Sequence, residues 1–166
     1  MLRLPVTLAL SAYALVITLV LGLTSGIIAA LRQNTWVDQA AMIFAMIGIS
    51  LPNFYLGLLM IIFFAVDLGW LPSGGYVAFT DNPLGWLATS TMPAISLALL
   101  LTGLLARITR STMLEVLRQD YIRTARAKGL PKRLVVVKHA LSNALIPITT
   151  IIGIIVSLLI SGSVVT

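Results

Sequence analysis

The stretch YIRTARAKGLPKR, Tyr121–Arg133, places five of the chain's eleven Lys and Arg residues within thirteen positions. It stands in a chain of 166 residues that is 59% hydrophobic and only 10% charged. Soluble domains carry roughly 25% charged residues, so this composition excludes an ordinary soluble domain. The sequence therefore predicts an all-α membrane protein in which the cationic stretch is a loop outside the lipid.

Four apolar runs are long enough to cross a membrane, which takes about 20 residues of helix. They are bounded by charged residues and cover positions 4–31, 40–66, 87–106 and 140–166. The sequence predicts a polytopic bundle of about four transmembrane helices. These helices form a single domain over residues 1–166, and the cationic loop covers residues 107–138.

The Lys and Arg residues are distributed unevenly over the predicted loops. Nine lie between Arg107 and Lys138, whereas segment 67–86 has two Asp residues and no cation. Because loops rich in Lys and Arg stay on the cytoplasmic side, loop 107–138 is predicted to be cytoplasmic and segment 67–86 external. Both chain ends then lie outside. Arg3 is a cation at an end that is predicted to be external, which the distribution of Lys and Arg disfavours. The conflict is smaller if the natural chain has another helix upstream, so we expect this chain to be a fragment of a longer protein.

The cationic loop has the pattern of a helix, a sharp turn and a second helix. Apolar Leu114, Leu117 and Tyr121 recur at intervals of three and four residues, which predicts one amphipathic helix over residues 107–128. Gly129 stands where a helix end favours a left-handed residue. Pro131 cannot continue that helix but can open the next one.

Three roles are open to such a loop. A basic amphipathic helix beside a membrane often lies on anionic headgroups. A docking helix is equally compatible, because small Thr124, Ala125, Ala127 and Gly129 would let a partner approach the backbone closely. Nucleic-acid binding is disfavoured, since no aromatic or Gly-rich platform accompanies the cations. The residues alone leave the first two roles open.

The same loop resembles the EAA motif of permease subunits of ATP-binding-cassette (ABC) importers. Gly129 takes the position of the motif glycine, so Arg123, Thr124 and Ala125 take the Glu-Ala-Ala positions, of which the first two depart from the general pattern. Leu145-Ile146-Pro147 lies near the distal Ile-x-Leu-Pro-like element. Further segments are similar to the oligopeptide, dipeptide and nickel permease subfamily: SLPNFYLG, GWLPSGGY, RITRSTMLEVL, DYIRTARAKGL and KHALSNALIP.

This resemblance implies a type I ABC importer permease that forms half of a translocation pathway for peptides or a related solute such as nickel. The implied partners are a second homologous permease subunit, cytoplasmic ATP-binding subunits and an external solute-binding protein, in the inner membrane of a bacterium or archaeon. The four spans would be the family's second to fifth. The implied ATPase-coupling residues are Asp120, Tyr121, Arg123, Thr124, Ala125, Arg126, Ala127, Gly129 and Leu130.

The chain itself is not expected to be an enzyme or to bind a cofactor. It contains no Gly-x-x-x-x-Gly-Lys-Ser/Thr segment, so ATP–Mg is expected on the partner subunits. It has no Cys and a single His, which leaves no predicted metal site. The alternative function is a channel or secondary transporter that does not use ATP. No charge lies within the four predicted spans, which disfavours a proton-coupled or sodium-coupled carrier.

Polar and small residues within the spans suggest local roles. Ser50, Pro52 and Asn53 interrupt the second span, and Asn53 either satisfies a kink or lines the translocation path. Pro147 predicts a helix break in the fourth span. Close helix contacts are predicted from two sets of small residues, Gly22, Ser25, Gly26 and Ala29 in the first span and Gly153, Ser157 and Ser161 in the fourth.

Overall fold

The computed structural model describes residues 3–165, and within them the side chains of residues 5–161; the predicted span end at Thr166 lies outside the described residues. The described chain is helical and contains no strand, which confirms the all-α membrane fold. Its elements are α1 (Arg3–Leu31), α2 (Trp36–Ser50), α3 (Asn53–Met60), the π-helical η1 (Ile61–Asp67), α4 (Pro83–Leu117), α5 (Asp120–Ala127), α6 (Lys132–Leu134), the π-helical η2 (Val135–Leu141) and α7 (Ser142–Val165).

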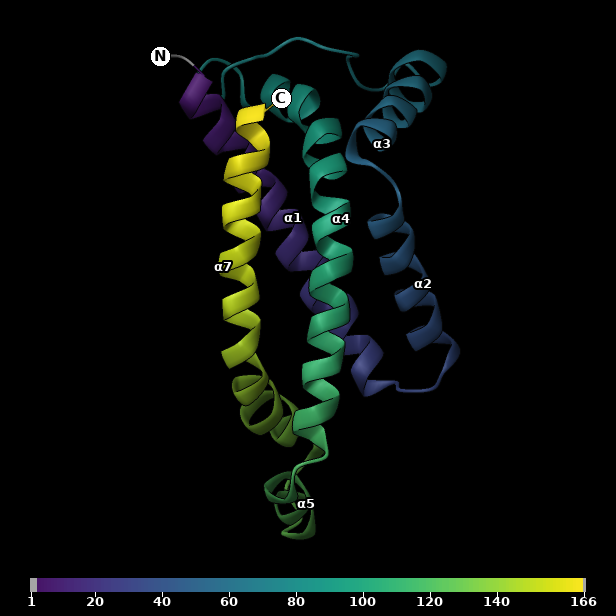
Figure 1. The fold of residues 1–166 in the computed structure, drawn as a ribbon, viewed down its shortest axis with the longest axis vertical. Helices are drawn as coiled ribbons and strands as arrows, with labels where there is room; N and C mark the ends of the chain where they lie inside the picture. The colour runs from purple at the N-terminus through teal and green to yellow at the C-terminus, as the bar shows by residue number, and fades with distance from the viewer. Residues whose placement is uncertain (1–2, 166) are drawn as a thin grey trace.

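Helix α4 stands between α7 on one side and α2 on the other, and α1 crosses behind it obliquely (Figure 1). Both described chain ends and the segment 68–82 lie at one end of the bundle. The short α1–α2 turn and α5 lie at the other, and α5 projects beyond the bundle (Figure 1). This arrangement matches the alternation of loops that the sequence predicts.

Three parts of the described chain are long and apolar enough to cross a membrane, and the number is four if the bent pair Trp36–Ser50 and Asn53–Asp67 is one span. The span predicted over residues 40–66 is interrupted at Ser50–Asn53 as expected, and the interruption is sharp, because α2 and the α3–η1 segment meet at a bend of 102°. Proline disfavours helical backbone at the residue before it. Leu51 accordingly is extended, with φ −92° and ψ 128°, and Pro52 starts the new helix direction.

The first set of predicted small-residue contacts is confirmed at the α1–α4 interface. A Cβ atom at Gly26 would lie 2.6 Å from the carbonyl oxygen of Ala106, and one at Gly22 would lie 2.9 Å from a Leu105 side-chain carbon. Helices approach this closely only where side chains are small. Glycine therefore sets the distance between α1 and α4.

The second set of predicted contacts, on α7, is not made within the described residues. A Cβ atom at Gly153 would meet nothing within 4 Å, and Ser157 and Ser161 are exposed. The buried face of α7 is aliphatic instead, with Ile148 and Ile155 fully buried. The small residues of α7 thus face away from the rest of the chain.

The predicted helix break at Pro147 is also wrong, because α7 continues through this residue. Proline removes one backbone donor, but the other hydrogen bonds of the helix are local and can remain. The irregular backbone precedes it, in the π-helical segment η2.

The predicted single amphipathic helix over residues 107–128 is divided in two. Helix α4 extends to Leu117, well past the predicted span end at 106, and its first turn is capped by Asn82, which accepts a hydrogen bond from the Gly85 N–H. Gln119 is extended with ψ 148° and separates α4 from α5. The cationic loop therefore presents α5 as a separate short helix.

Candidate functional site

Helix α5 has one buried face and one exposed face. Ile122 is fully buried and Ala125 is 7% exposed, and both belong to the main apolar core. The remaining predicted coupling residues of α5 are exposed: Asp120, Tyr121, Arg123, Thr124, Arg126 and Ala127. Two short apolar side chains thus anchor α5 to the bundle, and the rest of its surface is free to contact a partner.

The turn after α5 is built around Gly129, whose φ of 77° lies in the left-handed region. The N–H of Gly129 donates to the Arg126 carbonyl at 3.0 Å, and the N–H of Leu130 donates to the Ala125 carbonyl at 3.3 Å. These bonds satisfy carbonyls at the helix end. The predicted left-handed turn is confirmed. A Cβ atom at Gly129 would meet no atom within 4 Å, so this position opens outward.

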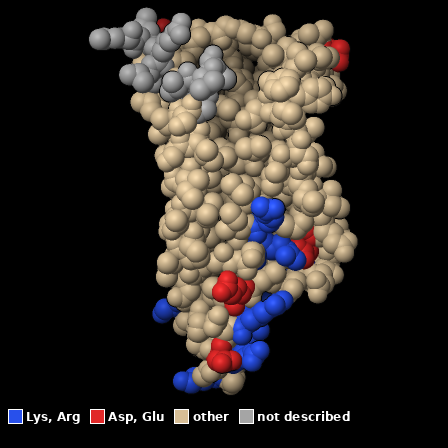
Figure 2. Space-filling view, in the orientation of Figure 1, with Lys and Arg blue, Asp and Glu red and all other residues tan. Residues whose placement is uncertain are grey.

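The end of the molecule that carries α5 is also its charged end. Figure 2 shows that the Lys and Arg side chains visible on this face gather in its lower half. Arg123 pairs with Asp120 at 3.3 Å, but both side chains are largely exposed. An exposed pair of this kind contributes only about 0 to 1 kcal/mol. The pair therefore orders the surface of α5 weakly and leaves it accessible.

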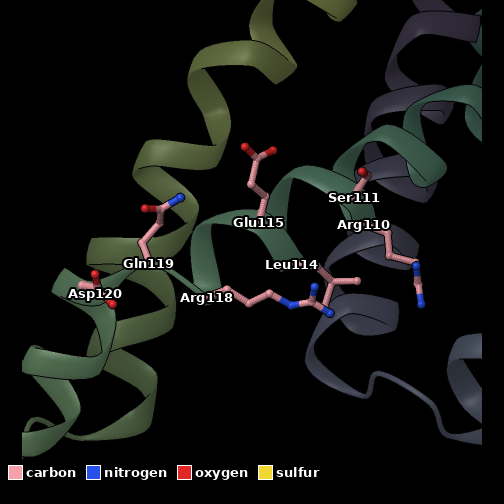
Figure 3. Close-up of a pocket in the computed structure, with 7 residues that line it drawn as sticks. All are labelled: Arg110, Ser111, Leu114, Glu115, Arg118, Gln119 and Asp120. Carbon is pink, nitrogen blue, oxygen red and sulfur yellow. The ribbon is translucent and has the colours of Figure 1, made fainter.

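A cavity of about 470 Å³ lies where α4 gives way to α5, and it is lined mainly by polar residues of α4 and the link, with Asp120 from α5. Figure 3 shows Arg118 extended past Leu114, while Glu115 points away from it. Charged side chains of both signs therefore line the cavity at the α4–α5 junction.

Asp38 and Arg110 form an ion pair that sequence reasoning missed. Nε of Arg110 donates to Oδ1 of Asp38 at 2.5 Å, and Nη2 donates to Oδ2 at 2.6 Å. Asp38 is only 3% exposed and also accepts a hydrogen bond from the N–H of Asn34. The sequence signal was available, because Asp38 is an acidic residue in the first turn of α2 next to an apolar run.

The three residues predicted for the translocation path, Ser50, Pro52 and Asn53, lie at the α2–α3 bend but do not line one common cavity. Ser50 donates to the carbonyl of Met46 at 2.8 Å, and Pro52 is exposed. Asn53 lines a cavity of about 400 Å³ between α3, α4 and the Ser73–Gly75 turn. Asn53 is thus the one residue of the three that lines this cavity.

The ionisable side chains of the described residues lie apart from one another, with two ion pairs as the exceptions. No group of three or more His, Asp or Glu side chains comes together in the part of the chain that was searched. The Asp38–Arg110 pair is compensated internally and lies at a helix–helix contact. The arrangement is therefore that of a membrane bundle with a short helix, α5, that projects from one end.

Comparison with known proteins gives consistent results. The model of the family described as "Binding-protein-dependent transport system inner membrane component" matches residues 22–166. A putative peptide transport system permease protein of Brucella suis is 52% identical over 163 residues, which cover 98% of this chain and 52% of the relative. The dipeptide transport system permease protein of Bacillus subtilis is 45% identical over 159 residues (96% and 49%).

A third relative, the oligopeptide transport system permease protein of Salmonella typhimurium, is 42% identical over 149 residues, which cover 90% of this chain and 47% of the relative. The chain thus spans about half the length of these curated relatives.

Proposed function

Since the chain belongs to the family of binding-protein-dependent transport system inner membrane components, we propose that it is a permease subunit of an ATP-driven importer. In this proposal residues 1–166 act as one membrane domain that contributes to half of a translocation pathway. The relatives are named for peptides, dipeptides or oligopeptides. We therefore propose a peptide as the solute and rank nickel below it.

The observation that carries this proposal is the exposed, rigidly anchored α5 with its outward-facing Gly129. We propose that α5 is the coupling helix, which docks in a groove of a cytoplasmic ATP-binding subunit. Ile122 and Ala125 would transmit movement of the partner to η2 and the bundle, because both are packed in the core. The other proposed partners are a second permease subunit and an external solute-binding protein, and ATP–Mg would bind the ATP-binding subunits alone.

The substitution Gly129→Val tests this role, and Gly69→Val is its matched control. Both glycines have positive φ, 77° and 63°, and an added Cβ atom would meet nothing within 4 Å at either site. Strain of about 1 to 2 kcal/mol is expected at both positions. Gly69 lies in the 68–82 segment at the opposite end of the bundle, so only Gly129→Val should crowd an ATPase groove.

We expect Gly129→Val to release the ATP-binding subunit during purification in mild detergent, or to uncouple ATP hydrolysis from peptide uptake. Gly69→Val should retain both, and both variants should insert in the membrane. Equal retention of the ATP-binding subunit and equal uptake in the two variants would contradict the coupling-helix proposal. The alternative of a channel or secondary transporter predicts that result.

The proposed orientation puts α5 in the cytoplasm of a bacterial or archaeal cell and the 68–82 segment outside. A cysteine at exposed Ser73 should react with a membrane-impermeant thiol reagent in intact cells. A cysteine at exposed Gln119 should react only after the cells are opened. The reverse labelling would refute the orientation derived from the distribution of Lys and Arg.

A further inference from the structure

A second cavity near α5 combines an apolar wall with a cluster of cations. It has a volume of about 610 Å³ and lies between the end of α1, the end of α4 and the α5–α6 turn. Leu31, Leu117 and Leu130 contribute to the apolar wall, and Arg118, Arg126 and Lys132 contribute the charge. The lining contains no acidic residue.

The three cations have no counter-ion within the described chain. The ion pairs among residues 5–161 are Asp38–Arg110 and Asp120–Arg123, and neither involves Arg118, Arg126 or Lys132. Three like charges around one cavity repel each other, and a bound anion would remove that repulsion. The cavity therefore has the charge of an anion site.

The apolar wall continues into the outer surface of the bundle. Leu31 is the last residue of α1 and is 37% exposed, and Ile28, one turn earlier, is 48% exposed. The end of a membrane-spanning helix lies at the level of the lipid headgroups. A ligand in this cavity can therefore have its charged part beside the loop while its apolar part remains in the lipid.

We propose that this cavity binds an anionic phospholipid. In this proposal the lipid phosphate lies among Arg118, Arg126 and Lys132. The parts of the acyl chains nearest the glycerol lie against Leu31, Leu117 and Leu130. Arg126 is the residue of α5 that lines the cavity, whereas Arg123 and Asp120 pair with each other on the exposed surface. The lipid would thus contact the Arg126 edge of α5, which also belongs to the implied coupling surface, and would leave the Asp120–Arg123 edge uncovered.

The test uses the full natural chain, purified in mild detergent with the subunits that it retains. The purified complex is titrated with phosphatidylglycerol or with phosphatidylcholine of the same acyl chains, and bound lipid is counted by native mass spectrometry. The test variant carries Arg118→Gln, Arg126→Gln and Lys132→Gln. The control variant carries Arg107→Gln, Arg133→Gln and Lys138→Gln, which removes the same charge from exposed positions outside the cavity.

The unsubstituted protein should prefer phosphatidylglycerol. Since each cation near an anionic headgroup contributes about fivefold in affinity, the test variant should lose about a hundredfold. The control variant should retain the preference. Leu117→Trp, which fills the cavity without changing the charge, should also lower phosphatidylglycerol binding and provides a result if the triple variant does not fold.

Three outcomes would overturn the proposal. The first is an equal loss in the test and control variants, which would indicate general attraction of cations to headgroups. The second is an absence of preference in the unsubstituted protein. The third is displacement of phosphatidylglycerol by inorganic phosphate at equal concentration, which would indicate a site for a free anion and no role for the apolar wall.

Discussion

Helix α2 and the α3–η1 segment come from one apolar run, yet the structure holds them very differently. Helix α2 buries Asp38, Ala45 and Gly48, whereas α3 and η1 bury no residue. A Cβ atom at Gly48 would lie 2.7 Å from the carbonyl oxygen of Leu99 on α4. At Gly57 of α3 the nearest atom would be 3.9 Å away.

This contrast shows that hydrophobicity and packing are separate properties of a membrane helix. Lipid tails are as apolar as leucine, so an apolar side chain gains little by leaving them for protein. Close backbone contact and polar pairs decide which helices associate. Glycines and the Asp38–Arg110 pair therefore fix α2 to α4, and the bend at Pro52 separates α3 from that rigid pair.

The largest effect is expected from breaking the ion pair with Arg110→Met. This change leaves the carboxylate of Asp38 buried without its partner, which costs about 3 kcal/mol. The free energy of unfolding of the purified full-length protein, measured by denaturant titration in detergent, should fall by that amount. Arg107→Met is the control, because Arg107 is exposed and its loss removes the same charge.

The double substitution Asp38→Asn with Arg110→Met should recover part of the lost stability, since it leaves no unpaired buried charge. Equal losses in Arg110→Met and Arg107→Met would show that the pair does not fix α2 to α4.

A smaller effect is expected from adding one methyl group at the α2–α4 contact or one methyl group on α3. In Gly103→Ala the new Cβ atom would collide with the carbonyl oxygen of Ala45, so α2 and α4 must separate. Overpacking of this kind costs about 1 to 3 kcal/mol. Gly57→Ala has room for the methyl group and should stabilise α3 by about 0.5 to 1 kcal/mol, because alanine favours helix over glycine.

The two variants should therefore shift the unfolding midpoint in opposite directions. A loss of stability in both would mean that α3 is packed as closely as α2.

The sequence predicted the helical bundle, the order of loops and the turn at Gly129, because these follow from local hydropathy, charge and backbone preference. It did not predict the sharp bend at Pro52, since a proline alone is compatible with a mild kink or a sharp turn. The Asp38–Arg110 pair joins residues 72 positions apart. Such pairing depends on how helices are placed around α4, which local patterns do not specify.

The same reason explains why two predictions on α7 are not met within the described chain. Gly153 and Ser157 have the spacing of a contact face, but within the described chain they have no helix opposite them. Pro147 has the chemistry of a helix breaker, but α7 continues past it. Residue type indicates what a position permits, and the neighbouring helix decides whether that property is used.

The smallest effect on stability is expected at Asn53, although its effect on transport should be clear. Asn53 is exposed at the start of α3, so Asn53→Ala should change the free energy of unfolding by less than about 0.5 kcal/mol. Asn53 lines the cavity that lies between α3, α4 and residues 73–75. If this cavity belongs to the translocation path, loss of a hydrogen-bonding group there should lower uptake of a labelled tripeptide.

Gln39→Ala provides the matched control, because Gln39 is an exposed amide at the other end of the same apolar run and lines none of the cavities described above. Uptake is normalised to the amount of protein in the membrane, so that a stability effect is separated from a transport effect. Lower uptake in Asn53→Ala at an unchanged amount of protein would link the loosely packed α3–η1 segment to solute passage. Equal uptake in both variants would remove Asn53 from the path and leave α3 as a lipid-facing helix.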